Sequence, residues 1–340
     1  MYDKRHSALL TVIVPMVIGE IVRAYGIDEK TATERFYASR VYEELSDEAR
    51  KLWHYSPKIL FSLYDESFSP ILNEALQVFL YHSILDTLEA QYTNEQEAIQ
   101  RLMKLETWLA FTTRDFTEKE RQNLKDRRYM PRTIPIAYDG LAIINNNNNP
   151  DSCITVRDFK RILRGEAKQW SDIYPDSKMG TIDVVFDNPL SSTVRWCVDS
   201  LLEGKEFKAP NIGAVKTSAA VIDYVEKHPG SLGIIGSNWL NDSRDTTNVT
   251  FKKNIRVMRV SRMETAKPYN SWQPYQYYIF NGHYPLIRTI YALLNEPRSG
   301  LPSNFAHFCR LPKGQLMIQK SGLLPIQAKM NTREIIVNKK

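Results

Sequence analysis

The chain has 340 residues, of which 43% are hydrophobic and 25% are charged, and its formal net charge is +6. This length allows two or three domains with substantial cores. Acidic and basic residues are mixed along the chain, so the positive excess indicates weak attraction for anions and argues against nucleic-acid binding. No apolar run is long enough to cross a bilayer, so we expect no stable membrane insertion. The widely spaced Cys153, Cys197 and Cys309 argue against a disulfide framework or a zinc site, and we expect no cofactor.

Residues 1–57 are predicted to form a small helical domain. Apolar residues recur with helical spacing from Leu9 onward, and Asp28 and Ser46 are expected to begin two further helices. Through Phe36-Tyr37-Ala38-Ser39 this domain resembles small bacterial helical domains of unknown function. That resemblance implies no chemistry.

The apolar segment Leu9–Gly19 follows a basic cluster, an arrangement that superficially resembles a signal peptide. It lacks a small-residue cleavage site, and the helical pattern continues through Glu20 and Arg23 to Tyr25. No lipid-acceptor cysteine lies near the N-terminus. We therefore interpret the segment as a buried helix and, from the chain as it stands, expect a cytoplasmic location.

After residue 57, strand and helix patterns alternate, which predicts an α/β fold with a mainly parallel sheet. Lys58–Asp65 fits either a helix or a strand, and we predict a strand. Ligands of parallel sheets sit at the carboxyl ends of the strands, which makes Ser67, Thr93 and Arg114 candidates. The next expected elements are a helix at Ile71–Tyr81, a strand at Thr87–Tyr92, a helix after Thr93-Asn94-Glu95 and a strand at Trp108–Phe111.

The alternation continues in the second half of the chain. Asp139-Gly140 is expected to separate two strands, and Asn145–Asn149 is expected to form a polar turn. The expected strands are Thr133–Tyr138, Leu141–Ile144, Gly233–Ile235, Ile255–Val260 and Ile287–Leu294, and the expected helices are Val156–Leu163, Val221–Val225 and Phe305–Gln319.

One strand–turn–helix stretch carries the strongest signal for a binding site. Strand spacing up to Phe186 is broken by Asp187-Asn188-Pro189, and helical spacing follows over Val194–Leu202. Ser191-Ser192-Thr193 therefore opens a helix, where backbone N–H groups lack partners within the helix and carry a partial positive charge. Hydroxyl groups beside such donors make a pocket for an oxyanion. Alternatively, Ser191 or Ser192 is simply an N-cap.

Several further motifs follow one another in an order typical of a known family. They are Tyr64-Asp65-Glu66-Ser67-Phe68-Ser69-Pro70-Ile71, Ala137-Tyr138-Asp139-Gly140-Leu141-Ala142, Ile154-Thr155-Val156 with Gly165 and Trp170-Ser171-Asp172, Phe186 through Arg195, Gly233-Ile234-Ile235-Gly236, Tyr284-Pro285-Leu286-Ile287-Arg288 and Ser321-Gly322-Leu323. With them the chain from Lys58 onward resembles the phosphate-binding protein of bacterial phosphate ABC transporters, in its Bacteroides-type versions.

This resemblance implies the type 2 periplasmic-binding-protein fold. In that fold, two α/β lobes joined by two crossing strands close on an oxyanion. The first lobe is expected to comprise residues 58–132 and 237–340, and the second residues 133–236.

The resemblance also implies a set of phosphate ligands. They are Ser67 after the first strand, Thr93 and Asn94 at a helix start, Arg114 after a strand, Asp187 after another, and Ser191, Ser192 and Thr193, with Ser192 in place of a family glycine. Better-known members carry an acid where Arg114 falls and an arginine near Asp187, so the two charges look exchanged between the lobes.

Three of these assignments have a plainer alternative. Arg114 pairs with Asp115 or Glu118 at the surface, Asp187 only shapes a turn, and Ser67 only caps a helix.

The resemblance implies a non-catalytic protein that binds inorganic phosphate and is recognised by an ABC transporter permease, which would place it in the periplasm. A cytosolic phosphate sensor is the alternative, or a docking module in which residues 1–57 bind a partner protein. We do not expect an enzyme, because the chain has no paired-carboxylate motif, metal cluster or Gly-x-Ser-x-Gly nucleophile elbow.

Overall fold

A computed structural model describes residues 4–25, 28–37, 39–46, 57, 60, 91, 93–240 and 254–328. The chain packs as two compact units, Met1–His82 and Ser83–Lys340. Ser67 and the predicted elements Ile71–Tyr81 and Thr87–Tyr92 fall outside the described residues, apart from Gln91.

Three helices make up the described part of the first unit: α1 (Lys4–Tyr25), α2 (Glu29–Tyr37) and α3 (Arg40–Ser46). The apolar stripe of α1 packs with Phe36 and Leu45 in one core, as helical spacing predicted. The expected cap of α2 is present, since Asp28 accepts a hydrogen bond of 2.9 Å from the backbone N–H of Thr31. Within the ranges given above, no helix combines the length and apolar character needed to cross a bilayer.

Pro57 and Leu60 are helical, and Leu60 is fully buried in the core of the first unit. The strand predicted for Lys58–Asp65 is therefore wrong at its one described position. Proline suits the first turn of a helix because its fixed φ is already helical and no N–H partner is needed there. The predicted domain boundary at residue 57 stays a prediction.

The second unit is built around β2 (Arg132–Asn146). We predicted a break at Asp139 and Gly140, but the strand continues through both residues. What changes there is the strand with which β2 pairs. β9 (Ile287–Leu294) pairs antiparallel with residues 132–140, and β6 (Ser231–Gly236) pairs antiparallel with residues 141–145. Gly140 serves close packing rather than a turn, since a Cβ there would lie 2.7 Å from Cβ of Pro274.

Further strands extend the sheet in both directions. β4 (Asp183–Phe186) runs parallel to β6 and to β5 (Ile212–Ala214), while β1 (Leu109–Thr112) runs antiparallel to β9. A separate parallel pair joins β3 (Cys153–Thr155) to β8 (Arg259–Ser261). The α/β class is as predicted, but the described sheet is mixed, with its antiparallel pairs along the two crossing strands β2 and β9.

The other described elements of this unit cover and connect the sheet. They are α6 (Glu95–Lys104), α7 (Glu118–Asp126), α8 (Val156–Leu163), η3 (Trp170–Asp172), α9 (Ser192–Trp196), η4 (Cys197–Leu201), α10 (Ser218–Lys227), η5 (Ser237–Trp239), β7 (Ile255–Val257), α12 (Gln276–Phe280), α13 (Leu301–Arg310), α14 (Pro312–Lys320) and β10 (Leu324–Pro325).

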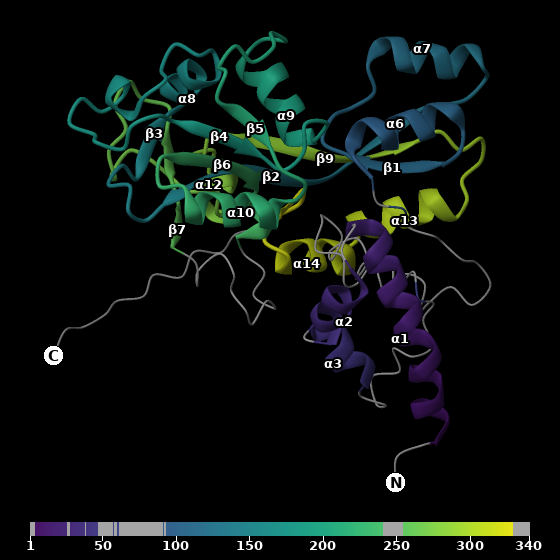
Figure 1. Ribbon diagram of the computed structural model, residues 1–340. Helices are drawn as coiled ribbons and strands as arrows, with labels where there is room; N and C mark the ends of the chain where they lie inside the picture. Colours follow the sequence, from purple (N-terminus) through teal and green to yellow (C-terminus); the bar gives the residue numbers. More distant parts are fainter. Residues whose placement is uncertain are drawn as a thin grey trace, which may run out of the picture. The chain divides into compact units, whose positions relative to one another are not determined.

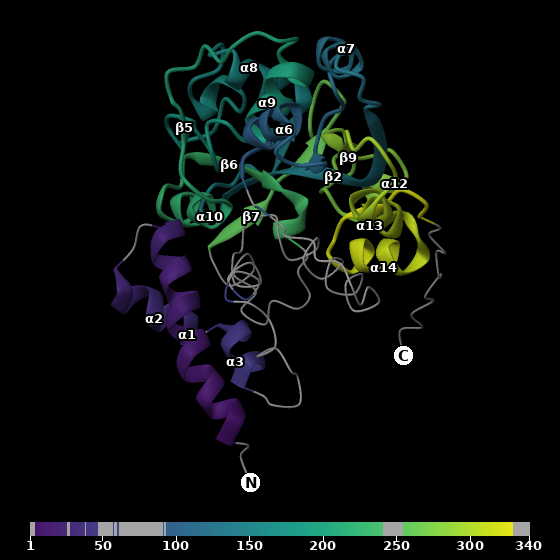
Figure 2. The ribbon, with the colours of Figure 1, turned by 90° about the vertical axis from the view of Figure 1, so that its right-hand side faces the viewer.

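Alternating side chains of the strands fill two layers. Val184 and Phe186 pack in the same core as residues of α8, whereas Val185 packs with residues of α10. Figures 1 and 2 show α8 and α9 on one face of the sheet and α10 on the other. Figure 1 also shows β2 and β9 leading away from this layered part toward β1 and α6, which have a hydrophobic core of their own.

Three further predicted helices and strands of this unit differ from the structure. The helix predicted at Phe305–Gln319 is two helices, α13 and α14, because Pro312 begins the second one and Leu311 between them is extended. The helix predicted at Val194–Leu202 is α9 followed by the π-helical η4. The strand predicted at Ile255–Val260 is interrupted at Met258, where pairing changes from β2 to β3.

This change of pairing bears on the predicted lobes. β7 and β8 pair with β2 and β3, and Leu286 packs in the core of the β4–β6 part. These segments therefore pack with residues that we predicted for the second lobe, although they lie in the range predicted for the first, and the lobe boundaries stay a prediction.

Gly233 lies in the middle of β6, where a Cβ would meet Val221, Ile144 and Val225 at 2.6–2.8 Å. We expect Gly233→Ala to lower the free energy of unfolding by about 1–3 kcal/mol through overpacking. Gly213→Ala on β5 is the control, because nothing lies within 4 Å of its added Cβ. Urea denaturation of both variants checks this, and equal losses would contradict it.

Candidate anion-binding site

The hydroxyl-rich turn lies where β4 ends and α9 begins. The Ser191 Oγ accepts a hydrogen bond of 3.3 Å from the backbone N–H of Val194, so Ser191 is the N-cap of α9. The alternative interpretation of the motif thus holds for Ser191. Ser192 and Thr193 make different contacts, because their hydroxyl groups accept hydrogen bonds from Arg288 Nη1 at 3.0 and 3.4 Å.

Arg288 reaches this turn from the crossing strand β9, and only 2% of its side chain is exposed. It lies opposite Asp139 of β2 in the strand register. Its Nε and Nη2 contact Asp139 Oδ2 at 2.8 and 2.7 Å. The other carboxylate oxygen accepts hydrogen bonds from the backbone N–H and the hydroxyl of Ser237. A close, fully hydrogen-bonded partner of this kind is what makes a buried charge tolerable.

Arg288 was not among the ligands predicted from the sequence, although Arg288 and Asp139 both lie in motifs that carry the family resemblance. Nothing in their spacing shows that residues 149 positions apart face each other across two strands. The signal available was an isolated acid and an isolated arginine, each inside a mostly apolar strand.

Asp187 follows β4 directly and lies beside the same turn. Burial raises its pKa above the ordinary 3.8, while hydrogen bonding to Ser191 and the positive charge of Arg288 act in the opposite direction. The hydroxyl of Ser218, in the first turn of α10, lies 3.5 Å from Asp187 Oδ2. The predicted carboxylate is thus within the electrostatic reach of the arginine at this turn.

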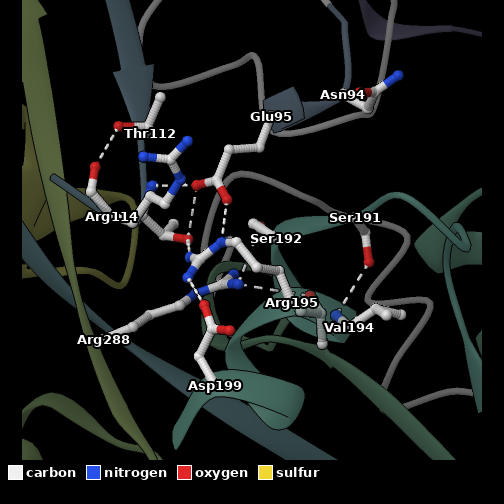
Figure 3. Close-up of polar contacts among 12 residues, drawn as sticks. Asn94, Glu95, Thr112, Arg114, Ser191, Ser192, Val194, Arg195, Asp199 and Arg288 are labelled. Atoms are coloured by element: carbon white, nitrogen blue, oxygen red, sulfur yellow. Dashed lines mark hydrogen bonds and ion pairs between the residues drawn. The ribbon is translucent and has the colours of Figure 1, made fainter. Parts of the chain in front are cut away.

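A second group of contacts joins α9 to the end of β1 and the start of α6, as Figure 3 shows. Glu95 accepts hydrogen bonds from the Thr113 backbone N–H, from the Thr113 hydroxyl at 2.9 Å, and from Arg195 Nε. Arg195 also donates to the Thr113 hydroxyl at 2.8 Å and to Asp199 at 2.9 Å. Arg195 is therefore held in an ion-pair network.

The other predicted ligands have partners within the chain. Arg114 makes a two-pronged ion pair with Glu120, at 2.7 and 2.8 Å, which raises the pKa of Arg114. Burial opposes ionisation of Glu120, but its bonds to Arg114 and Thr117 outweigh burial and lower its pKa. The structure thus shows Arg114 paired, as the plainer interpretation proposed, although with Glu120 rather than with the side chain of Asp115 or Glu118.

Thr93 and Asn94 stand just before α6, and Asn94 is its N-cap. The Thr93 hydroxyl donates to Glu97, and Asn94 Oδ1 accepts from the Glu97 backbone N–H at 2.9 Å. The structure therefore brings Asp187, Ser191, Ser192 and Thr193 together around Arg288, while Arg114, Thr93 and Asn94 contact acidic residues near α6 and α7.

Metal binding has no support among the described residues, where no three His, Cys, Asp or Glu side chains gather closely enough to hold an ion. Cys153, Cys197 and Cys309 are buried and form no disulfide.

A family model described as a PBP superfamily domain matches residues 57–310. The chain therefore belongs to the PBP superfamily, and the family resemblance expected from its motifs is confirmed.

Curated relatives include phosphate-binding proteins PstS. The Pseudomonas aeruginosa protein is 23% identical over 221 residues, covering 61% of this chain and 64% of the relative. The Staphylococcus haemolyticus protein is 22% identical, covering 62% of each chain, and the Borreliella burgdorferi protein is 24% identical, covering 76% of this chain and 87% of the relative. The chain thus spans less than two thirds of the length of the first two relatives.

Solved structures show the same fold. A putative phosphate ABC transporter substrate-binding protein with bound phosphate from Clostridium perfringens superposes with a TM-score of 0.60 at 18% identity, covering 77% of this chain and 96% of that one. An ABC-type phosphate transport receptor from Vibrio cholerae gives 0.59 at 19% identity, covering 75% and 95%. The predicted two-lobed type 2 periplasmic-binding-protein fold is thereby confirmed.

The Arg288–Asp139 pair yields a prediction for stability. Asp139→Asn leaves a buried guanidinium without its counter-charge, so we expect it to cost about 3–5 kcal/mol of unfolding free energy. The double variant Asp139→Asn/Arg288→Met should lose less than the sum of the two single variants, because it removes both charges. Urea denaturation of the four proteins measures this coupling, and simple additivity would show that the two charges do not support each other.

Asp187 yields a prediction for pH. Because burial raises its pKa in the folded chain, the folded state holds this proton more tightly than the unfolded state. Its contribution to stability is then fully present below the ordinary value of 3.8 and is lost as pH rises through the raised pKa. As pH rises through that range, we expect the free energy of unfolding of Asp187→Asn to increase relative to that of the wild type.

Urea denaturation at a series of pH values measures the effect. Asp176→Asn, which changes an exposed carboxylate, is the control. Curves for Asp187→Asn and wild type that stay parallel at every pH would contradict the expectation.

Proposed function

We propose that this protein is a non-catalytic binding protein for inorganic phosphate and serves as the substrate-binding component of a phosphate ABC transporter. The observation that carries the proposal is the Arg288 guanidinium, which is buried and directed at the hydroxyl groups of Ser192 and Thr193. The names of the PstS relatives and of the solved phosphate-binding structures support the choice of phosphate.

The chemistry of the turn suits an oxyanion. A buried anion loses its hydration, which is costly unless protein donors replace the water. Ser192 and Thr193 supply hydroxyl groups beside the backbone N–H groups that open α9, and Arg288 supplies the positive charge. The ion pair with Asp139 fixes the arginine in place, so these donors are already oriented before an anion arrives.

The proposed site therefore consists of Ser192 and Thr193 with Arg288, of Ser191 as the N-cap of the same helix, and of Asp187 as a nearby carboxylate. Ser67, Thr93, Asn94 and Arg114 remain predicted ligands. For Thr93 and Arg114 to bind phosphate, their present bonds to Glu97 and Glu120 would have to be exchanged.

A permease of the same transporter is the proposed partner. A two-lobed binding protein differs in shape with and without its ligand, because a ligand held between the lobes favours the closed arrangement. A catalytic role is not part of the proposal, since a binding site that holds an unreacted ion needs donors and no nucleophile.

Isothermal titration calorimetry with inorganic phosphate tests the proposal. We expect the wild-type chain to bind, and Ser192→Ala/Thr193→Val to bind roughly tenfold more weakly or worse, since hydrogen bonds to charged groups contribute about 1.5–3 kcal/mol each. Ser200→Ala, an exposed hydroxyl in η4, is the control and should keep wild-type affinity. Absence of heat with phosphate, sulfate and molybdate would reject an oxyanion-binding function, and heat with molybdate or sulfate alone would reject phosphate.

A further inference from the structure

The Glu95 carboxylate is held by donors from two separate parts of the unit. Glu95 is the first residue of α6, and only 6% of its side chain is exposed. One of its oxygens accepts from the backbone N–H and the hydroxyl of Thr113, at the end of β1. The other accepts from Arg195, which belongs to α9.

These donors are of the kind that binds an oxyanion. A backbone N–H, a hydroxyl and a guanidinium converge on two negatively charged oxygens, and each would serve a phosphate oxygen equally well. A carboxylate and a phosphate carry the same sign of charge and need the same donors. They cannot occupy this group of donors together without strong repulsion.

The donors around Glu95 adjoin the proposed phosphate site. Arg195 stands two residues after Thr193, and the Thr193 hydroxyl contacts Arg288. The hydroxyl groups of Ser192 and Thr193 face the crossing strand β9. The Arg195 guanidinium instead contacts the residues at the end of β1 and at the start of α6. The first turn of α9 is thus common to both groups of donors.

From this geometry we propose that Thr113 and Arg195 form the other half of the phosphate site, and that phosphate displaces the Glu95 carboxylate when it binds. The inference rests on the proposed function. It gives Glu95 a defined role as an internal competitor: the carboxylate links α6 and α9 until an anion with more oxygens takes over the same donors. Phosphate affinity is then set by the difference between two anions rather than by the donors alone.

The test is the phosphate dissociation constant of Glu95→Gln, measured by titration calorimetry. Glutamine keeps the size of the side chain but not its charge, so we expect binding about tenfold tighter than in wild type, the scale of effect found for close charge pairs. Glu106→Gln is the control, because it removes the same charge from an exposed side chain just after the end of α6. It should change the constant less than about twofold.

A second variant keeps the test decisive if Glu95→Gln folds poorly, which its thermal midpoint would show. Arg195→Gln should weaken phosphate binding by roughly tenfold, because it removes a proposed ligand. Suppose that the wild type binds phosphate, but that Glu95→Gln binds it with equal or lower affinity, or Arg195→Gln with equal affinity. Either result would overturn the inference and leave the proposed function intact. If the wild-type chain itself fails to bind phosphate, the proposed function fails and the inference falls with it.

Discussion

The buried ion pair between Arg288 and Asp139 is the interaction on which the site depends. Two charges removed from water are stable only as a close pair with its remaining bonds made. Strand register places the residues opposite each other, and Ser237 satisfies the second oxygen of Asp139. Because Nε and Nη2 are taken by Asp139, Nη1 is left to face the hydroxyl groups at the start of α9. One interaction thus joins the crossing strands and orients the arginine.

Around this pair, positive and negative side chains alternate closely. Arg195 contacts Glu95 and Asp199, and Arg114 contacts Glu120. Each guanidinium is therefore held by a carboxylate of the same chain. Such an arrangement keeps the arginines ordered, but it also means that an incoming anion competes with internal carboxylates. The electrostatic design differs from a simple positive pocket, in which affinity would follow from the number of cations.

Local patterns predicted much of the fold. Helical spacing located α8 at Val156–Leu163, and alternation located β9 at Ile287–Leu294, both with the bounds later observed. Errors arose where the outcome depends on distant segments. β2 continues through Gly140, where β6 replaces β9 as its neighbour. β7 and β8, which we placed with the first lobe, pair with β2 and β3. Spacing within a segment carries no information about such partners.

The sequence by itself determined the chemistry of the α9 turn, since three hydroxyl residues after a strand and before a helix can be read locally. It also determined the family, through motifs that occur in a fixed order. Only the tertiary structure decided which charges meet this turn. Arg288 comes from a strand 95 residues beyond Thr193, whereas Arg114, the arginine favoured from position, lies close to Glu120 in the folded chain. The reason is that ion pairs form between side chains brought together by strand register and helix packing, and neither is encoded in the spacing of a single motif.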